Sequence, residues 1–462
     1  MKSRPASPKL FGTDGIRAHA GGYPLDPRTI PAIGRAIGAE LGGTVILGCD
    51  PRESSPWIAR LLRAGLATVG AWVEDAGVVP TPAVALLTQQ ADAAGGIMIS
   101  ASHNAYGDNG IKVFAADGRK IENDAEARIE HCVATDDGAD AATSFDSTGD
   151  GDTHDPTPSP LADRYVELLR KRFPSGNWLS GLGIVVDCAN GAMSRIAPAM
   201  FRALGAEVHA IHADPDGTNI NAGCGAVHPA SLLATVKENT ADFGVAFDGD
   251  GDRAMFATRA GRLIDGDAVL LLITRRLRRA GKLENSVVVG TSMTNYALEQ
   301  VLAAEGVRLV RTDVGDRYVF REMLSLRASI GGEPSGHIIF GDFGLSGDGL
   351  LTALKLAETI VEGTSSLDAL TKDWNPMPQL IRNVPAAEKV PLESLSEVSG
   401  KIDEIAGLLR GRGRIVVRYS GTEALLRIMI ESDSAETNEA YAADLAALFV
   451  RSLGPAGRLS MG

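Results

Sequence analysis

The sequence predicts an α/β protein of several domains, and three observations support this. The chain has 462 residues, which is too long for one hydrophobic core and suggests roughly three to four domains. Its hydrophobic fraction of 44% is ample for packed interiors. Short apolar runs that end in Gly, Asp or Thr alternate with segments of helical periodicity. This alternation is typical of α/β layers, in which ligands bind at the ends of strands.

The same strand-and-loop pattern recurs at three distant positions. Each apolar run leads into a small or polar loop: 45–47 before 48–50, 184–186 before 187–191, and 287–289 before 290–292. Between these runs, the periodicity predicts helices at 57–71 and 196–204. We therefore expect repeated α/β domains.

Two breaks divide the chain. Residues 136–160 are rich in Asp, Ser, Thr, Gly and Pro, which predicts a linker between a first and a second domain. A second break is expected at 372–378. Beyond it, the pattern predicts strands at 414–418 and 425–431 and a helix at 435–451.

Charge and composition narrow the classes of function. The net charge of −13 opposes binding to nucleic acid or anionic membranes, and the basic run 275–279 is expected to be a solvated helix end. No apolar stretch approaches the roughly 20 residues needed to span a bilayer, and residues 1–5 lack a signal core. We expect a soluble cytoplasmic protein. The four cysteines lack a CxxC pair, which argues against disulfides or zinc, and Cys49 and Cys188 are expected to be buried.

The first candidate site loop is Ser100-Ala101-Ser102-His103-Asn104, which follows the apolar run 97–99. It presents a hydroxyl at a strand end, and the cation of Lys112 is near in sequence. Serine is a poor nucleophile until a base, a metal or a covalent phosphate changes its chemistry. A helix cap explains these residues about as well as catalysis does.

The second loop carries three carboxylates, from Asp248, Asp250 and Asp252, after the apolar run 243–247. Alternating with glycines, they can surround one hard cation, and oxygen ligands suit Mg²⁺ or Ca²⁺ rather than zinc. A calcium-binding EF-hand would need an acidic residue at loop position 12, where Arg259 stands. A similar string at 149–152 follows no strand, so we interpret it as a solvated loop.

Two further loops carry recognition chemistry. In 331–337, Glu333, Ser335 and His337 offer hydrogen-bonding groups for sugar hydroxyls or an amine, although a glycine-rich turn explains the same pattern. In 418–423, a guanidinium, hydroxyls and glycine amides suit a phosphate dianion, with a hairpin turn as the alternative. Together, the four loops predict phosphoryl transfer on a phosphorylated sugar.

In this order, the four loops resemble those of the α-D-phosphohexomutase superfamily across nearly the whole chain. Within it, the closest resemblance is to the bacterial branch that interconverts glucosamine 6-phosphate and glucosamine 1-phosphate. The supporting motifs are Phe11-Gly12-Thr13-Asp14-Gly15-Ile16-Arg17, Asn219-Ile220-Asn221 with Cys224-Gly225, Val314-Gly315-Asp316-Arg317-Tyr318-Val319, and Ser346-Gly347-Asp348-Gly349.

The resemblance implies four domains around a central cleft. Three are related α/β domains, and the fourth is an α+β domain similar to the TATA-binding-protein fold. The expected boundaries are 1–157 for the phosphoserine loop, 158–258 for the metal loop, 259–372 for the sugar loop and 373–462 for the phosphate-binding domain.

The resemblance also assigns roles to the residues of the loops. Ser102 is expected to carry phosphate and to hold Mg²⁺ with the three carboxylates of the second loop, next to the cation of Arg253. Arg17, His103 and Lys112 are expected beside the transferring phosphoryl group, with Lys112 as the general acid/base. The expected substrate-binding residues are Glu333, Ser335, His337, Arg418, Ser420, Gly421, Thr422 and Arg427.

The implied reaction proceeds through phosphoserine and glucosamine 1,6-bisphosphate, and it serves UDP-N-acetylglucosamine and cell-wall precursor synthesis. The enzyme is expected to be a monomer or homodimer. Pro334 occupies the sugar loop where this branch commonly has Gln or Asn, so a phosphomannomutase/phosphoglucomutase with the same mechanism is the alternative. A phosphatase that uses Ser102 and a silent sugar-phosphate binding protein are two further alternatives.

Overall fold

The computed structural model describes residues 9–136, 159–343, 346–386, 388–420 and 424–453 of the chain. It consists of two compact units, one formed by 1–291 with 312–372 and the other by 292–311 with 373–462. The predicted linker lies mostly outside the described residues, as do the string at 149–152 and two predicted site residues, Gly421 and Thr422. In the described residues, no helix is long and apolar enough to cross a membrane.

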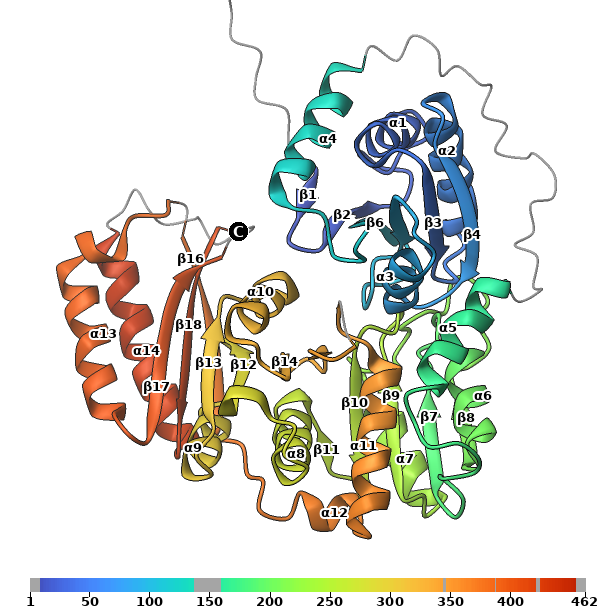
Figure 1. Cartoon of the computed structure of the whole chain (residues 1–462). Coiled ribbons are helices and arrows are strands. Elements are labelled where there is room, and N and C mark those ends of the chain that lie inside the picture. The colour runs from blue at the N-terminus through green and yellow to red at the C-terminus, as the bar shows by residue number, and fades with distance from the viewer. Residues whose placement is uncertain (1–8, 137–158, 344–345, 387, 421–423, 454–462) are drawn as a thin grey trace, which may run out of the picture. The chain divides into compact units, whose positions relative to one another are not determined.

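The first sheet of the larger unit has six strands in the order β1-β2-β6-β5-β3-β4, with α1, α2 and α4 packed around a shared core on one face (Figure 1). Alternate residues of β3 face away from that core toward α3, where a Cβ on Gly48 would lie 2.6 Å from Val84. Helices α1 and α2 approach so closely that a Cβ on Gly65 would lie 2.1 Å from the carbonyl oxygen of Pro31. The elements are β1 (Phe11–Gly12), β2 (Gly15–His19), α1 (Thr29–Leu41), β3 (Thr44–Cys49), α2 (Ser55–Thr68), β4 (Trp72–Val78), α3 (Thr81–Gln90), β5 (Gly95–Ile99), β6 (Asp108–Ala115) and α4 (Asn123–Thr135).

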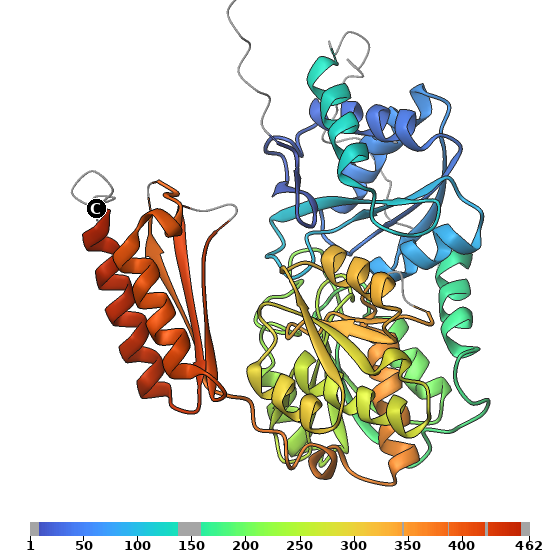
Figure 2. The ribbon, with the colours of Figure 1, turned by 60° about the vertical axis from the view of Figure 1, so that its left-hand side comes forward.

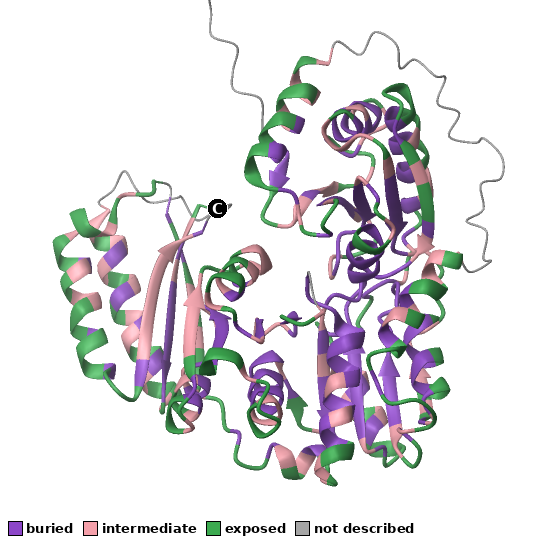
Figure 3. Cartoon of the chain, in the orientation of Figure 1, coloured by how far each residue is buried: buried purple, intermediate pink, exposed green. Residues whose placement is uncertain are grey.

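The second sheet has the order β11-β10-β9-β7-β8, and every residue of its strand β9 is buried (Figure 3). Its elements are α5 (Pro160–Arg170), β7 (Gly183–Asp187), α6 (Ile196–Ala203), β8 (Glu207–Ile211), α7 (Ala230–Glu238), β9 (Phe243–Phe247), β10 (Ala254–Thr258) and β11 (Leu263–Ile264). A third sheet contains β12 (Val287–Thr291), β14 (Ile330–Gly332) and β15 (Ile338–Phe340), accompanied by α8 (Gly266–Arg279), η1 (Glu284–Ser286), α10 (Asp316–Leu326), α11 (Gly349–Gly363) and α12 (Leu367–Leu370).

These three sheets repeat one arrangement, which confirms the predicted three related α/β domains. In the first, β4, β3 and β5 are parallel and β6 is antiparallel to β5. In the second, β8, β7 and β9 are parallel and β10 is antiparallel to β9. In the third, β12 and β14 are parallel and β15 is antiparallel to β14. The first three predicted site loops occupy the same position in each repeat, between the last parallel strand and the antiparallel one.

The smaller unit contains an antiparallel sheet in the order β16-β18-β17, with α13 and α14 along one face (Figure 2). The apolar side chains between helices and sheet include Ile405, Ile428, Leu445 and Phe449. Its elements are α9 (Tyr296–Ala304), β13 (Arg308–Thr312, except its last residue), β16 (Gln379–Pro385), η2 (Leu392–Ser394), α13 (Ser396–Leu409), β17 (Gly413–Tyr419), β18 (Leu425–Ser432) and α14 (Ala435–Ser452). The predicted α+β class is confirmed, while its likeness to the TATA-binding-protein fold stays a prediction.

Most predicted elements match those of the structure. Helix α2 ends at Thr68, three residues before the predicted end, because Gly70 adopts a left-handed φ of +77° that closes the helix. The basic run 275–279 lies at the end of α8, as expected, and Cys49 and Cys188 are buried. Neither β16 nor α13 was predicted. In β16, Arg and Asn interrupt the apolar residues, and the strand follows directly on the predicted break.

Candidate active site

Ser102 lies in the loop between β5 and β6, in a conformation that serine rarely adopts. Its φ is +52°, and only 1% of the residue is exposed. Its backbone N–H donates to the side-chain oxygen of Ser100 at 2.9 Å, and its Oγ donates to Oδ2 of Asp248 at 2.5 Å. Strain of this kind costs about 1–3 kcal/mol and persists only where surrounding contacts hold it. The hydroxyl is thus fixed against the second loop.

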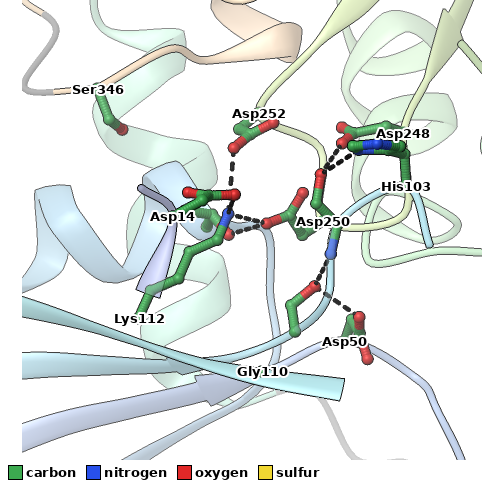
Figure 4. Close-up of polar contacts among 12 residues, drawn as sticks. Asp14, Asp50, His103, Gly110, Lys112, Asp248, Asp250, Asp252 and Ser346 are labelled. Carbon is green, nitrogen blue, oxygen red and sulfur yellow. Dashed lines mark hydrogen bonds and ion pairs between the residues drawn. The ribbon is translucent and has the colours of Figure 1, made fainter. Parts of the chain in front are cut away.

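Asp248, Asp250 and Asp252 converge, as the spacing predicted. All three are buried, and each offers an oxygen within 4.8 Å of the others (Figure 4). In the described part of the chain, the Oδ1 atoms of Asp250 and Asp252 have no hydrogen-bond partner. Burial and the two neighbouring carboxylates raise the pKa of Asp248 well above its usual range. These converging hard oxygen donors, two of which have no hydrogen-bond partner among the described residues, fit a divalent cation.

Lys112, on β6, supplies positive charge to this cluster. Its Nζ donates to Asp250 at 2.7 Å and to Asp252 at 3.3 Å, and it lies 3.6 Å from Asp14. Burial alone would lower the pKa of Lys112, but the three carboxylates outweigh it and raise that pKa above its usual value. The side chain is therefore an ammonium group in this state.

A second cation, on the half-buried Lys120, extends the network across domains. Lys120 contacts Asp14 at 2.7 Å and Asp316 at 2.8 Å, so Asp14 lies between two ammonium groups. Burial opposes ionisation of Asp14, yet Lys112 and Lys120 hold its pKa well below the usual range. The sequence assigned no role to Asp14 or Lys120, although Asp14 lies in the motif at 11–17.

Arg17, His103 and Arg253 were also predicted to belong to this site, and each makes polar contacts with other residues of the predicted motifs. Arg17 on β2 forms an ion pair with Asp14, and the Nδ1 of His103 is 3.4 Å from Ser102 Oγ. Burial and the positive charges of Arg253 and Arg17 lower the pKa of His103 to about 4, so its ring is neutral near pH 7. The backbone N–H of Arg253 donates to Asp248 at 3.2 Å, and its Nε is 3.7 Å from Asp252.

In the sugar loop, Glu333 and Ser335 are half-buried. An Oε1 of Glu333 accepts the N–H of Gly315 at 3.1 Å, and the carbonyl of Pro334 accepts the N–H of Gly266 at 3.0 Å. The Oγ of Ser335 is buried and has no hydrogen-bond partner among the described residues. An unpaired buried hydroxyl costs about 1–3 kcal/mol, so a ligand that pairs it offsets that cost.

His337 connects this loop to the metal loop. Its Nδ1 is 3.7 Å from Asp252, its Nε2 is 3.6 Å from Asp316, and Nε2 accepts the N–H of Gly347 at 2.9 Å. Burial disfavours its charge, but the carboxylates raise its pKa to about 9. Because Nε2 accepts the N–H of Gly347, this nitrogen carries no proton in the observed arrangement. The neutral ring then directs its Nδ1–H toward Asp252.

The described residues that were predicted to bind phosphate lie in the smaller unit. Arg418 and Arg427 are directly opposite each other on β17 and β18 and line a cavity of about 260 Å³. Like charges directly opposite on paired strands repel, so a bound anion would stabilise this pair. Ser420 is buried, and its carbonyl accepts the Nζ of Lys389 at 2.7 Å.

The comparisons identify the class of protein. Four models of phosphoglucomutase/phosphomannomutase domains match the chain: α/β/α domain I at 8–140, domain II at 163–261, domain III at 265–377 and the C-terminal domain at 381–448. The chain belongs to the α-D-phosphohexomutase superfamily, and it is an intramolecular phosphotransferase of the isomerase class.

Its curated relatives point to one branch of that superfamily. A phosphoglucosamine mutase of Solibacter usitatus is 44% identical over 450 residues, which cover 96% of this chain and 99% of the relative. The phosphoglucosamine mutase of Chlamydia trachomatis serovar D is 42% identical over 92% of this chain and 93% of its own length.

Solved structures share the fold. A phosphoglucomutase/phosphomannomutase family protein of Burkholderia thailandensis superposes with a TM-score of 0.78 at 24% identity, covering 98% of this chain and 99% of its own. The N-acetylphosphoglucosamine mutase of Aspergillus fumigatus, solved with GlcNAc-6P and magnesium, gives a TM-score of 0.63 at 16% identity, with coverage of 97% and 96%.

Proposed function

We propose that this enzyme interconverts glucosamine 6-phosphate and glucosamine 1-phosphate through phosphorylated Ser102 and a glucosamine 1,6-bisphosphate intermediate. The observation that carries the proposal is the buried contact of 2.5 Å between Ser102 Oγ and Asp248, within a triad of carboxylates that Lys112 also contacts. A serine directed at a metal-binding cluster suits phosphoryl transfer, which depends mainly on positioning and charge neutralisation. The curated relatives support glucosamine phosphate as the sugar.

In the forward half-reaction, the bond from Ser102 Oγ to phosphorus breaks and a bond from the free sugar hydroxyl to phosphorus forms. The hydroxyl loses its proton, and Ser102 Oγ gains one. Lys112, held against Asp250 of the metal loop, is the proposed acid/base: its ammonium group gives a proton to Ser102 Oγ, and the resulting amine takes the proton of the sugar hydroxyl. Arg17 and Arg253 add positive charge, while neutral His103 is a hydrogen-bonding neighbour.

We propose that Asp248, Asp250 and Asp252 hold Mg²⁺ together with an oxygen of phosphorylated Ser102. When bound, the ion neutralises charge on the transferring phosphoryl group. The Aspergillus relative was solved with magnesium, which supports this choice of ion.

The non-reacting end of the substrate requires a separate binding site. Arg418, Ser420 and Arg427 are proposed to bind the non-reacting phosphate, with Gly421 and Thr422 outside the described residues. Glu333 and Ser335 are proposed to bind sugar hydroxyls. The bisphosphate then turns end for end and returns its other phosphoryl group to Ser102, which completes the isomerisation.

We further propose the domain boundaries 1–157, 158–258, 259–372 and 373–462, which the four matched ranges support approximately. The central cleft, a cytoplasmic location, a role in UDP-N-acetylglucosamine synthesis and a monomeric or homodimeric state remain predictions.

Phosphorus NMR tests the function directly. Enzyme, Mg²⁺ and a trace of hexose 1,6-bisphosphate are mixed with glucosamine, mannose or glucose 6-phosphate in parallel. We expect the glucosamine 1-phosphate signal to grow fastest, with almost no inorganic phosphate released. Faster turnover of mannose or glucose phosphate would favour the phosphomannomutase/phosphoglucomutase alternative, and net release of phosphate would indicate a phosphatase.

A further inference from the structure

The loop that carries Ser102 is held by side chains rather than by a strand ladder. Two carbonyl oxygens in this loop, those of Ser102 and Asn104, accept hydrogen bonds from side chains. Each of these two oxygens accepts from two side-chain donors, one from the first domain and one from the second. The same two donors serve both carbonyls.

The first donor is Arg52, whose side chain is completely buried. Its Nη2 donates to the carbonyl of Ser102 at 3.0 Å and to that of Asn104 at 2.9 Å. Its Nη1 donates to the carbonyls of Ala105 and, at 3.0 Å, Asp108. One planar guanidinium group therefore fixes four carbonyls along seven residues of the loop.

The second donor is Asn221, from the second domain. Its Nδ2 donates to the carbonyl of Ser102 at 2.9 Å and to that of Asn104 at 3.0 Å. The space around this contact is full, because a Cβ on Gly249 would lie 2.5 Å from the Ser102 carbonyl and 2.8 Å from Asn221 Nδ2. The amide therefore ties the serine loop to the second domain, next to Gly249 of the loop that carries the carboxylates.

A buried carboxylate supports the first donor. Asp50 accepts from Nε of Arg52 at 2.9 Å, from Ser100 Oγ at 2.6 Å and from Ser55 Oγ at 3.1 Å. Ser100 Oγ in turn accepts the N–H of Ser102. Both the N–H and the carbonyl of Ser102 are thus fixed by a network that begins at Asp50.

We propose that Arg52 and Asn221 are positioning residues that hold Ser102 in its left-handed conformation, so that Oγ faces the carboxylates in every step. This inference rests on the proposed role of Ser102 as phosphate carrier. Ser102 must donate one phosphoryl group and accept another in each isomerisation, and displacement of a reacting atom by about 1 Å can cost about 10²-fold in rate. Neither residue needs to contact the substrate.

The test compares Asn221→Ala with Asn219→Ala, a matched control two residues away whose Nδ2 donates to the carbonyl of Asp214 and not to the serine loop. We expect Asn221→Ala to lower kcat by about 10–100-fold with KM nearly unchanged, and to slow phosphorylation of Ser102 by hexose 1,6-bisphosphate in intact-mass spectrometry. Hydrogen exchange should accelerate in residues 100–110. Asn219→Ala should show none of these changes.

Arg52→Lys provides an independent variant that retains the charge opposite Asp50. The ammonium group of lysine cannot donate to all four carbonyls at once, as the planar guanidinium group does. We therefore expect kcat of Arg52→Lys to be lower than that of Asn221→Ala, and hydrogen exchange in residues 100–110 to be faster than in the wild type. An unchanged kcat and exchange rate in Asn221→Ala, or equal losses in Asn219→Ala, would overturn the proposal.

Ser102→Ala separates this inference from the proposed function. Full activity in that variant would refute the function itself. An inactive Ser102→Ala combined with an unaltered Asn221→Ala would refute only the positioning roles.

Discussion

The serine loop and the sugar loop occupy the same position in two repeats of one fold, yet their polar groups are treated in opposite ways. Ser102 has its N–H, Oγ and carbonyl all hydrogen-bonded inside the protein. In the sugar loop, Ser335 Oγ is buried without a hydrogen-bond partner among the described residues. The difference is that the loop proposed to carry phosphate has the polar groups of its serine satisfied by the protein, whereas the loop proposed to bind sugar keeps a buried hydroxyl for a ligand.

The metal loop, in the remaining repeat, combines both features. Asp248 is paired with Ser102, while the Oδ1 atoms of Asp250 and Asp252 have no partner in the described residues. This loop is therefore positioned by the serine loop and also holds donors for an ion. Substitutions in the three loops should separate these roles.

Ser102→Ala should have the largest effect. Without the hydroxyl there is no phosphate carrier, so we expect mutase activity to fall by about 10³-fold or more. The melting temperature should change little, because a methyl group fits the same space. Activity assays and thermal melts check both parts, and near-full activity would contradict the comparison.

Asp250→Asn should come next. Mg²⁺ that binds only the folded state stabilises it, by about 2.7 kcal/mol at an ion concentration of 100 times Kd. We expect Mg²⁺ to raise the melting temperature of the wild type but not of the variant, and turnover to lose its response to Mg²⁺. An equal thermal shift in both proteins would exclude this site.

Ser335→Ala should affect binding and not chemistry. Loss of one hydrogen bond to a sugar hydroxyl costs about 0.5–1.5 kcal/mol, so we expect KM to rise by about 2- to 10-fold with kcat retained. Ser325→Ala, on the exposed face of α10, is the matched control. A fall in kcat without a change in KM would place Ser335 in the chemistry.

A last prediction concerns stability and pH rather than activity. Burial raises the pKa of Asp348, at the start of α11, from 3.8 to about 6, although Tyr165 and the helix N–H groups oppose this shift. Between these two pKa values, Asp348 is deprotonated in the unfolded chain but still protonated in the folded one. The free energy of unfolding therefore falls as pH rises from about 4 to 6, by about 3 kcal/mol in total. Asp348→Asn keeps a residue that can cap the helix but removes the titrating carboxyl group, so the melting temperature of this variant should change less with pH over that range. An unchanged pH profile would argue against the shift.

The sequence predicted the repeated α/β architecture because each parallel strand is a buried apolar run that ends in a polar loop. It also predicted that Ser102 and the three carboxylates would belong to one site. Lys120 was not found, since its partners Asp14 and Asp316 are distant in sequence and only folding brings them together. Arg52 was missed although an Asp-Pro-Arg string after a buried strand was a visible signal. The hydrogen-bond acceptors of Arg52 are backbone carbonyls, which every residue type has, so the sequence does not reveal them.

The most direct test of the central claim is to locate the phosphoryl group during turnover. The enzyme is phosphorylated with hexose 1,6-bisphosphate, digested, and mapped by peptide mass spectrometry before and after a brief exposure to glucosamine 6-phosphate. We predict phosphate on Ser102 before exposure and its transfer to sugar bisphosphate afterwards, without release as inorganic phosphate. Phosphate on another residue, or none on Ser102 during active turnover, would contradict the account.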